Sequence, residues 1–349
     1  MRRASVSVVI VNWNGARLLP ACLDALLAQT RPADEIVMVD NGSTDGSVAL
    51  VRGAYPGVTV LPLAENLGFA EGNNRGIAAS RGELVVTLNN DAIPSAGWLE
   101  QLCAPLEADP RLGAAMSTML FAHAPDRIAS AGIRVYRNGL ALDDLAGRRW
   151  TGRRAALRPI FGPSAGAAAY RRTLLDDVGG FDADFFLYLE DADLAWRARL
   201  RGWESVHAPA ATVLHVYSAS SGQGSAFKGY YLARNRLWCL RKNLPAALAR
   251  RHAGAIAAYD AGALLYGLLT RDGAALRGRL AGLRDGDIAR KRRAVQRARI
   301  ASDADLERWL APSPSALRVL ALKRRVDRLS RPPVPPVRHG TTPGSGADR

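Results

Sequence analysis

Glu83-Leu84-Val85-Val86-Thr87-Leu88-Asn89-Asn90-Asp91 is the stretch that decides the fold. Its apolar, β-branched first part indicates a strand buried within a sheet. The run ends abruptly in two amides and a carboxylate, with Pro94 close behind. In an open α/β sheet, ligands bind outside the carboxyl ends of the strands, and a carboxylate placed there can hold a hard divalent cation. An Asx turn that only closes the strand is the alternative.

Strand and helix patterns alternate over the first ninety residues or so. We expect strands at 6–11, 35–39, 58–63 and 83–88, and helical segments at 18–27, 45–54 and 68–80. Strands separated by helices of this length imply right-handed crossovers and a parallel sheet. The sequence therefore predicts an α/β fold built on a mostly parallel sheet.

Polar residues follow each of the four predicted strands. The four runs are Asn12-Trp13-Asn14-Gly15, Asp40-Asn41-Gly42-Ser43, Glu65-Asn66-Leu67-Gly68 and Asn89-Asn90-Asp91. Because parallel strands share their carboxyl edge, we expect these runs to converge on one ligand site. Asp40 suits a nucleoside, since a carboxylate can accept hydrogen bonds from a ribose hydroxyl or a base N–H. Capping of the next helix by Asp45 or Ser43 is compatible with that role.

In order, spacing and content, the blocks 6–14, 39–47, 65–76 and 88–91 resemble the family 2 glycosyltransferases. These enzymes have the GT-A fold and use nucleotide sugars. The sequence is most similar to the rhamnosyltransferase-like branch, which acts on cell-envelope polysaccharides, and the resemblance runs from about residue 6 to about residue 244. It implies transfer of a sugar from a nucleotide-diphosphate sugar, with dTDP-rhamnose or a UDP-sugar favoured, to a hydroxyl of a glycan or polyprenyl-lipid-linked acceptor.

The resemblance also implies roles for residues at the strand ends. Asp40 would contact the base, and Val11 and Asn12 would line the pocket for base and ribose. Asp91 would match the metal-binding carboxylate of the Asp-x-Asp motif and hold Mg²⁺ or Mn²⁺. Asn89 replaces the first Asp of that motif, so we expect weaker metal binding. The other residues expected to bind the nucleotide sugar are Asn66, Gly68, Asn73, Asn89 and Asn90.

A second candidate site lies at 185–197, where an aromatic and apolar run leads to three acids at a predicted helix N-terminus. The helix dipole accounts comfortably for one acid there, and less well for three. Inverting glycosyl transfer needs one general base to take the proton from the acceptor hydroxyl. In the family this role belongs to the Asp that falls on Asp191, with Glu190 orienting acceptor or base. Asp193 and Arg197, four positions apart, are expected to form a structural pair.

His215 follows the apolar run 211–214. Related family members place a metal-binding histidine at about this position, which implies a site formed by Asp91, His215, diphosphate oxygens and water. A purely structural histidine is the alternative. Downstream, we expect the Ser/Gly loop 218–225 to close over the diphosphate. Lys228 and Arg234 are expected to help neutralise it.

Gly162-Pro163-Ser164-Ala165-Gly166 fits the G-x-S-x-G pattern, and Ser164, Asp191 and His215 follow the order of a serine hydrolase triad. A hydrolase is the weaker alternative, because Pro163 precedes the serine and no oxyanion-loop motif lies upstream. In the glycosyltransferase interpretation, 162–170 is a strand beneath the acceptor site, and its small residues leave room for a bulky acceptor.

The charge of the chain is concentrated late. The net charge is +15 with a pI near 10.5, and residues 271–331 carry 17 Lys/Arg against seven Asp/Glu. A basic region favours an anionic partner. We expect no nucleic acid, since aromatic residues are few and no known motif appears, although a basic nucleic-acid-binding protein is the other alternative. The apolar run 253–269 with the clusters 290–293 and 323–325 instead predicts docking on an anionic membrane surface.

Three divisions of the chain follow. We expect a GT-A domain at 1–244, with a nucleotide-sugar half at about 1–121 and an acceptor half at about 159–244. A helical basic region is expected at 245–331 and a disordered Pro/Gly/Ser-rich tail at 332–349. The three scattered cysteines indicate a reducing compartment, and no stretch of 18 uncharged apolar residues exists. Together these predict a cytoplasmic protein, peripheral on the inner face of the plasma membrane.

Overall fold

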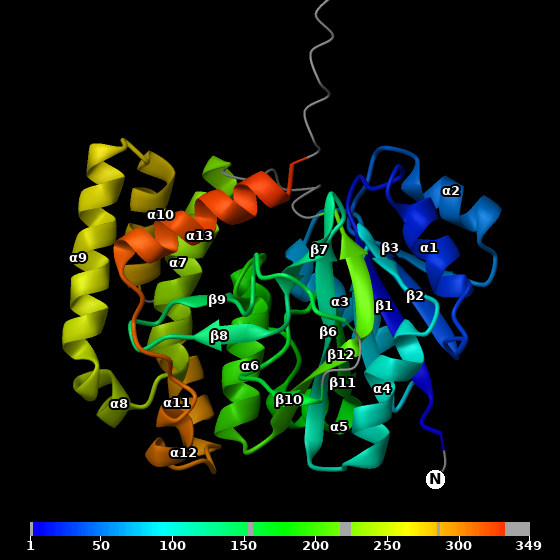
Figure 1. Cartoon of the computed structure of the whole chain (residues 1–349). Coiled ribbons are helices and arrows are strands. Elements are labelled where there is room, and N and C mark those ends of the chain that lie inside the picture. The colour runs from blue at the N-terminus through cyan, green and yellow to red at the C-terminus, as the bar shows by residue number, and fades with distance from the viewer. Residues whose placement is uncertain (1–2, 153–155, 217–224, 285–286, 332–349) are drawn as a thin grey trace, which may run out of the picture.

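A computed structural model describes residues 3–152, 156–216, 225–284 and 287–331 (Figure 1). Within these residues the centre is a ten-stranded sheet, in which β5 (Ala92–Pro94) pairs with β12 and β7 (Ala124–Ser130) pairs with β6. The other strands follow one another in the order β10 (Arg158–Pro159), β12 (Glu204–His215), β6 (Leu112–Phe121), β11 (Ala167–Arg171), β4 (Leu84–Asn89), β1 (Val6–Asn12), β2 (Glu35–Asp40) and β3 (Thr59–Pro62).

The four predicted strands pair in parallel within this sheet, as β6 and β12 also do. β1 pairs in parallel with β2 and β4, and β2 pairs in parallel with β3. The connecting helices are α1 (Leu19–Leu27), α2 (Ser47–Ala54) and α3 (Gly68–Ala79). The predicted α/β class with a mostly parallel sheet is confirmed, and each predicted strand lies within two residues of an observed one. The carboxyl ends of β1, β2 and β4 therefore lie at one edge.

The expectation of a strand over 162–170 is wrong in its first half. The strand β11 begins at Ala167 and runs antiparallel between β4 and β6. The residues before it use their backbone groups elsewhere: the Gly162 carbonyl accepts from Ile133 N, and the Ala165 carbonyl accepts from Thr87 Oγ1. Pro163 has no N–H to donate to a neighbouring strand. These contacts leave 162–166 as a loop that ends beneath the carboxyl end of β4.

The sheet and its helices enclose the main hydrophobic core. Strands β1, β4 and β6 bury almost every side chain, as strands covered on both faces must. Helices α4 (Trp98–Ala108) and α5 (Arg172–Val178) pack on the antiparallel side. The hairpin of β8 (Ile133–Val135) and β9 (Ala141–Asp143) forms a separate two-stranded sheet.

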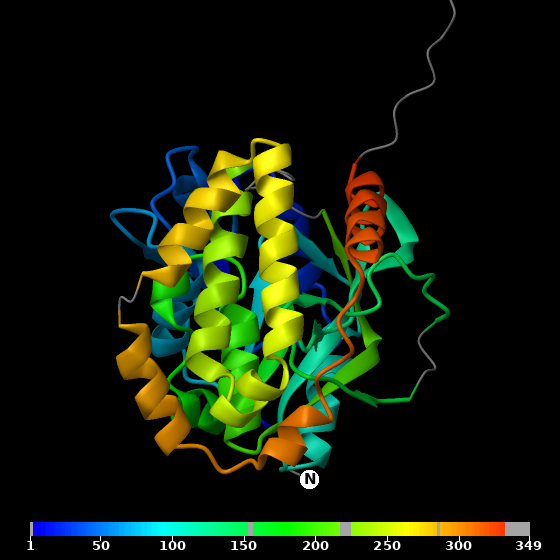
Figure 2. The same ribbon diagram turned by 90° about the vertical axis from the view of Figure 1, so that its left-hand side faces the viewer.

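Helices predominate in the second half of the described chain. The 3₁₀ turn η1 (Ala183–Phe185) and α6 (Glu190–Leu200) precede β12, and α7 (Ala226–Asn243) follows it. The remaining helices are α8 (Ala246–Arg251), α9 (Ala253–Leu269), α10 (Gly273–Leu283), α11 (Ile288–Arg297), α12 (Asp303–Glu307) and α13 (Ala316–Leu329). Helices α7, α9 and α10 run side by side at the end of the sheet away from β3, and α13 crosses near β7 (Figures 1 and 2).

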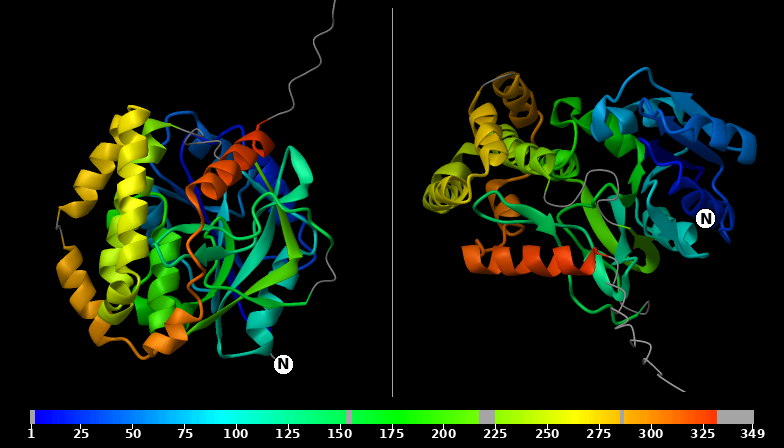
Figure 3. Two further views of the ribbon diagram at one scale, coloured as in Figure 1. Left: turned by 60° about the vertical axis from the view of Figure 1, so that its left-hand side comes forward. Right: turned by 90° about the horizontal axis from the view of Figure 1, so that it is seen from above.

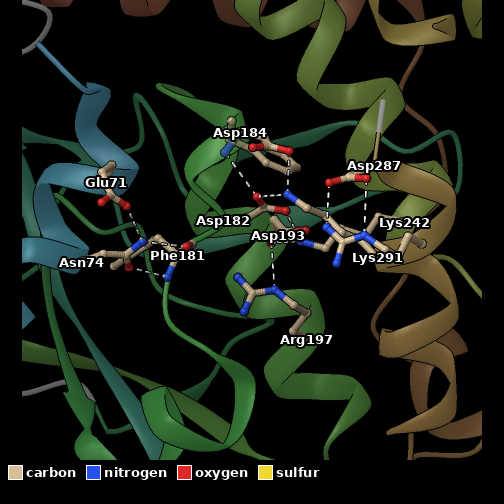
Figure 4. A network of polar contacts seen from close by, with 12 residues as sticks. Glu71, Asn74, Phe181, Asp182, Asp184, Asp193, Arg197, Lys242, Asp287 and Lys291 are labelled. Carbon is tan, nitrogen blue, oxygen red and sulfur yellow. Dashed lines mark hydrogen bonds and ion pairs between the residues drawn. The ribbon is translucent and has the colours of Figure 1, made fainter. Parts of the chain in front are cut away.

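A buried ion network joins α6 to α7 and α11 (Figure 4). Asp193 is fully buried, and its Oδ2 accepts from Arg197 Nε at 2.8 Å and from Lys242 Nζ at 2.9 Å. Lys242 also donates to Asp182 at 2.6 Å, and Lys291 donates to the other oxygen of Asp182 at 2.5 Å. The predicted Asp193–Arg197 pair is confirmed, and it forms part of a larger set of contacts that fixes α6.

The basic cluster 290–293 is partly used inside the protein. Lys291 contacts Asp182 and Asp184, and Arg292 donates to the carbonyls of Arg241 and Leu244. Burial lowers the pKa of Arg292, whose guanidinium donates to these two carbonyls. Two of the four cations in this cluster therefore attach α11 to the body of the protein.

Cys22, Cys103 and Cys239 are buried and free of disulfides. None of the helices in the described residues combines the length and the apolar character that crossing a bilayer requires. The expected closing loop lies at 218–225, of which the described residues include only Ser225, and the expected tail at 332–349 lies outside them.

Candidate active site

The carboxyl ends of β1, β2 and β4 meet through hydrogen bonds between three buried side chains. Asn12 Nδ2 donates to Asp40 Oδ1 at 2.9 Å, and Asn90 Nδ2 donates to Asn12 Oδ1 at 2.8 Å. The second oxygen of Asp40 accepts from the backbone N–H of Ser43 at 2.9 Å. The expected convergence of these strand ends is confirmed.

Asn41 attaches the third polar run to this edge. Its Nδ2 donates to Asn66 Oδ1 at 2.9 Å and to the Gly68 carbonyl at 3.0 Å, and its Oδ1 accepts from Leu67 N. Asn66 Oδ1 also accepts from Gly68 N at 2.9 Å, so the loop before α3 is closely held. The sequence reasoning missed Asn41, because an asparagine before glycine is equally typical of any tight turn.

Two residues predicted to bind the nucleotide sugar, Val11 and Asn73, make their contacts with α3 or within it instead of in the hydrogen-bonded cluster. The Val11 side chain lies against Gly72, where a Cβ would be 2.8 Å from Val11 Cγ1. Asn73 is buried, and its Nδ2 donates back to the Phe69 carbonyl four residues earlier at 2.8 Å. Val11 therefore packs against α3, whereas the Asn73 amide is bound within that helix.

Asp91, His215 and Asn89 form the next group. His215 Nε2 lies 3.1 Å from Asp91 Oδ1 and 3.2 Å from Asn89 Nδ2. Burial disfavours the imidazolium, but the Asp91 carboxylate outweighs it and raises the pKa of His215. The buried Asn89 Oδ1 has no hydrogen-bond partner among the described residues. One carboxylate, one imidazole and one free amide oxygen are thus brought together from strands β4 and β12 and the turn after β4.

Glu190 and Asp191 open α6. Asp191 Oδ2 accepts from Ala165 N at 3.3 Å, and its Oδ1 accepts from Ala192 N at 2.7 Å. Burial, with a further contribution from the Asp143 carboxylate, raises the pKa of Asp191 to about 6. Burial and the Asp191 charge raise the pKa of Glu190 well above its ordinary value, and Glu190 Oε2 has no partner among the described residues. The two acids therefore titrate as a coupled pair.

Asp143, at the end of β9, is a site residue that the sequence reasoning missed. Burial raises its pKa, and its charge acts on Asp191, His215 and Lys228. The hairpin is joined to the 162–166 loop by the Ile133 N–H donating to the Gly162 carbonyl at 2.8 Å. Nothing in the residues around Asp143 shows periodicity or a motif, so the sequence alone offered no signal for it.

The geometry excludes the serine hydrolase alternative. The G-x-S-x-G segment lies before strand β11 instead of at a strand-to-helix elbow. The Ser164 hydroxyl hydrogen-bonds Asp191, whereas His215 contacts Asp91 and Asn89. A triad needs the histidine between the serine and the acid, so His215 does not serve as the base of Ser164.

Lys228 and Arg234, expected near a diphosphate, differ in their surroundings. Burial lowers the pKa of Lys228, whose ammonium lies 5.2 Å from the Tyr188 ring centroid. Arg234 Nη2 donates to the carbonyls of Asp184 and Phe185 at 2.8 and 3.0 Å, and its guanidinium stacks on Trp238. Arg234 is therefore already engaged with the segment before α6.

The fold and the site together define a sugar-transferring enzyme, and the comparisons agree. The model of Glycosyl transferase family 2 matches residues 7–179. The chain is 31% identical over 272 residues to the N-acetylglucosaminyl-diphospho-decaprenol L-rhamnosyltransferase of Mycobacterium tuberculosis, covering 71% of this chain and 85% of that protein. The chain belongs to glycosyl transferase family 2, and it is a glycosyltransferase that acts on nucleotide sugars.

Two solved structures share the fold. GalNAc-T7 with UDP, GalNAc and Mn²⁺ superposes with a TM-score of 0.57 at 18% identity, over 68% of this chain and 48% of that one. The mannosyltransferase PcManGT of Pyrobaculum calidifontis, with GDP-Man and Mn²⁺, gives 0.50 at 21% identity, over 82% and 88%. The GT-A fold expected from the sequence is confirmed.

Proposed function

We propose that this enzyme moves a sugar with inversion from a nucleotide-diphosphate sugar, dTDP-rhamnose or a UDP-sugar, to a hydroxyl of a glycan or polyprenyl-lipid-linked acceptor. The observation that carries the proposal is the acid pair Glu190–Asp191, held at the start of α6 with the pKa of Asp191 raised to about 6. The similarity to a rhamnosyltransferase whose name specifies a diphospho-decaprenol compound supports the acceptor class.

Asp191 is the general base of this reaction. A base with a pKa near 6 is ionised at neutral pH and still basic enough to take a proton as the acceptor hydroxyl attacks. The Ala165 and Ala192 N–H groups fix its carboxylate, and Asp143 makes it more basic. Glu190, whose pKa is raised well above its ordinary value by burial and the Asp191 charge, orients the acceptor or the base.

The polar strand ends form the donor side. Asp40 and Asn12 present the base and ribose site at the ends of β2 and β1, held by the bonds between them. Asn66 and Gly68 bring the loop before α3 to the same edge. Val11 acts indirectly in this arrangement, by packing against Gly72 of α3.

Asp91 and His215 fit a divalent metal, Mg²⁺ or Mn²⁺, with the free Asn89 oxygen beside them. When bound there, the metal would stabilise the charge of the departing nucleoside diphosphate. Within the described residues no three His, Cys, Asp or Glu side chains gather as a metal site, so the protein supplies few ligands and the diphosphate must complete the set. The two Mn²⁺-bound structures of the same fold support this assignment.

A membrane surface at the α9–α10 end would present a lipid-linked acceptor to this site. The last turns of α9 expose Leu265, Leu268 and Leu269 to 58%, 58% and 75%, with exposed Arg271 directly after them. This end of α9 lies on the same side of the molecule as the carboxyl ends of the parallel strands, at the top of Figure 1 (seen from above in Figure 3). Exposed leucines beside arginine suit anionic headgroups, and a peripheral position on the cytoplasmic face follows.

A thermal-shift titration with dTDP-rhamnose, UDP-sugars and GDP-sugars, each with and without Mn²⁺, tests the donor assignment. A saturating donor should stabilise the folded protein and so raise its Tm. Mass action gives about 2.7 kcal/mol of added unfolding free energy at a donor concentration a hundredfold above Kd. No shift with any nucleotide sugar would contradict the proposal.

Co-sedimentation with vesicles of anionic or neutral lipid tests the membrane surface, and binding that survives L265S/L268S/L269S would contradict it.

A further inference from the structure

The loop 186–189 joins η1 to α6 in a strained conformation. Phe186, Tyr188 and Leu189 have φ values of 63°, 68° and 64°, in the left-handed region that residues other than glycine rarely occupy. Such residues persist only where their surroundings hold them. Because Glu190 and Asp191 follow directly, the conformation of this loop sets where the acid pair lies.

One side chain holds the loop from α7. Asn235 is fully buried, and its Nδ2 donates to the carbonyls of Phe185, Leu187 and Tyr188 at 2.9, 3.0 and 2.7 Å. Its Oδ1 accepts from Arg234 Nε at 2.8 Å, which orients the amide so that its hydrogens face the loop. An amide that satisfies several buried carbonyls is difficult to replace, because each abandoned carbonyl would lie buried without a donor.

The same loop contacts the donor side. The Phe186 carbonyl accepts from Ala70 N at 3.2 Å, and a Cβ on Gly68 would lie 2.6 Å from the Phe186 ring. One turn further along α3, Asn74 exchanges two hydrogen bonds with the backbone of Phe181, at 2.8 and 2.9 Å (Figure 4). The segment before α6 is thus held by α3 on one side and by Asn235 on the other.

We propose that Asn235 is a positioning residue that sets Glu190 and Asp191 against the donor loop by holding 186–189 in its left-handed conformation. This inference rests on the proposed function. Asn235 is fully buried and its amide hydrogens are directed at the loop carbonyls, so it acts through the loop. Its loss lets the loop relax toward ordinary backbone angles and moves the base away from the acceptor hydroxyl, while the polar strand ends keep their own contacts.

The test compares Asn235→Ala and the isosteric Asn235→Asp with the wild-type enzyme. The Asp variant keeps the shape of the side chain and removes its donated hydrogen bonds. A displacement of the order of 1 Å costs about 10²-fold in rate, so we expect kcat to fall about 10²-fold in both variants. Donor KM, and the Tm shift caused by the donor, should stay at wild-type values. If either variant fails to fold, Asn235→Ser, whose hydroxyl can still donate one bond, replaces it.

Leu248→Ala is the matched control for stability. Leu248 is fully buried in the same hydrophobic cluster as Phe185 but is not a partner of the loop carbonyls. It should lower Tm and leave kcat unchanged. Unchanged kcat in the Asn235 variants, or an equal loss of kcat in Leu248→Ala, would overturn the positioning role. If wild-type enzyme transfers no sugar from any nucleotide sugar, the proposed function itself fails, and that outcome is distinct from the other two.

Discussion

Replacing Asp191 by Asn should abolish turnover and at the same time stabilise the folded protein at neutral pH. The amide has nearly the same shape as the carboxylate, so the fold is retained, but it cannot take a proton from the acceptor. A positioned general base contributes about 10²–10⁴-fold to a reaction of this kind. We expect kcat to fall by at least that factor, with donor binding unchanged.

The gain in stability follows from the raised pKa. The pKa of Asp191 is about 6 in the folded protein against 3.8 for an unperturbed Asp. As pH rises between these two values the unfolded chain releases its proton first, and wild-type protein loses stability. A separation of about two pK units corresponds to about 3 kcal/mol of unfolding free energy. This stability difference between the variant and the wild type is complete above pH 6 and absent below about pH 4. For a chain of this length that is a Tm difference of about 4 °C.

The assay is thermal unfolding of wild-type and Asp191→Asn protein across pH 4 to 8, run with turnover on the same samples. Asp126→Asn is the matched control, since Asp126 lies on β7 with a side chain 56% exposed. It should give no pH-dependent difference. A variant that retains turnover refutes the base assignment, and one that is less stable than wild type at pH 7 refutes the burial of an ionised Asp191.

Three further predictions concern the metal group, the donor loop and the ion network. Asp91→Ala and His215→Ala should each weaken Mn²⁺-dependent donor binding in calorimetry. Wild-type Mn²⁺ affinity should also rise with pH, because Asp91 raises the pKa of His215 and a ligand imidazole must be neutral. A Mn²⁺ affinity that does not change with pH would contradict this. Gly68→Ala should destabilise the fold by about 1–3 kcal/mol in urea unfolding, because φ is +86° and its Cβ would meet Phe186; an unchanged midpoint would contradict the packing. Lys242→Met should lower the free energy of unfolding by about 3–5 kcal/mol in the same assay, because it leaves the buried charge of Asp193 with less compensation. An unchanged free energy of unfolding would show that the fold does not depend on this network.

The parallel half of the fold and its polar edge could be predicted from the sequence. Apolar runs that end in Asn12, Asp40 and Asn89 carry their own periodicity, and parallel strands must share an edge. The Asp193–Arg197 pair was equally predictable, because the spacing of four is a local property of a helix.

The residues that complete the site could not be predicted, because they depend on tertiary contacts. Asp143 is brought to the acids by a two-stranded hairpin without a sequence signature. Asn235 sits between two arginines, a pattern typical of an exposed helix face, yet its partners lie some fifty residues earlier in the chain. The wrong prediction of a strand over 162–166 has the same origin. Two backbone carbonyls of this segment accept hydrogen bonds from Ile133 and Thr87 instead of pairing along a strand.

The most direct test of the central claim is the anomeric configuration of the product. Wild-type enzyme would be incubated with dTDP-rhamnose or a UDP-sugar and an N-acetylglucosaminyl-diphospho-polyprenol, with Asp191→Asn beside it, and the new linkage read by NMR. One attack by an acceptor hydroxyl that Asp191 deprotonates predicts a linkage inverted relative to the donor, and none from the variant. A retained configuration, or product formed by Asp191→Asn at the wild-type rate, would contradict the account.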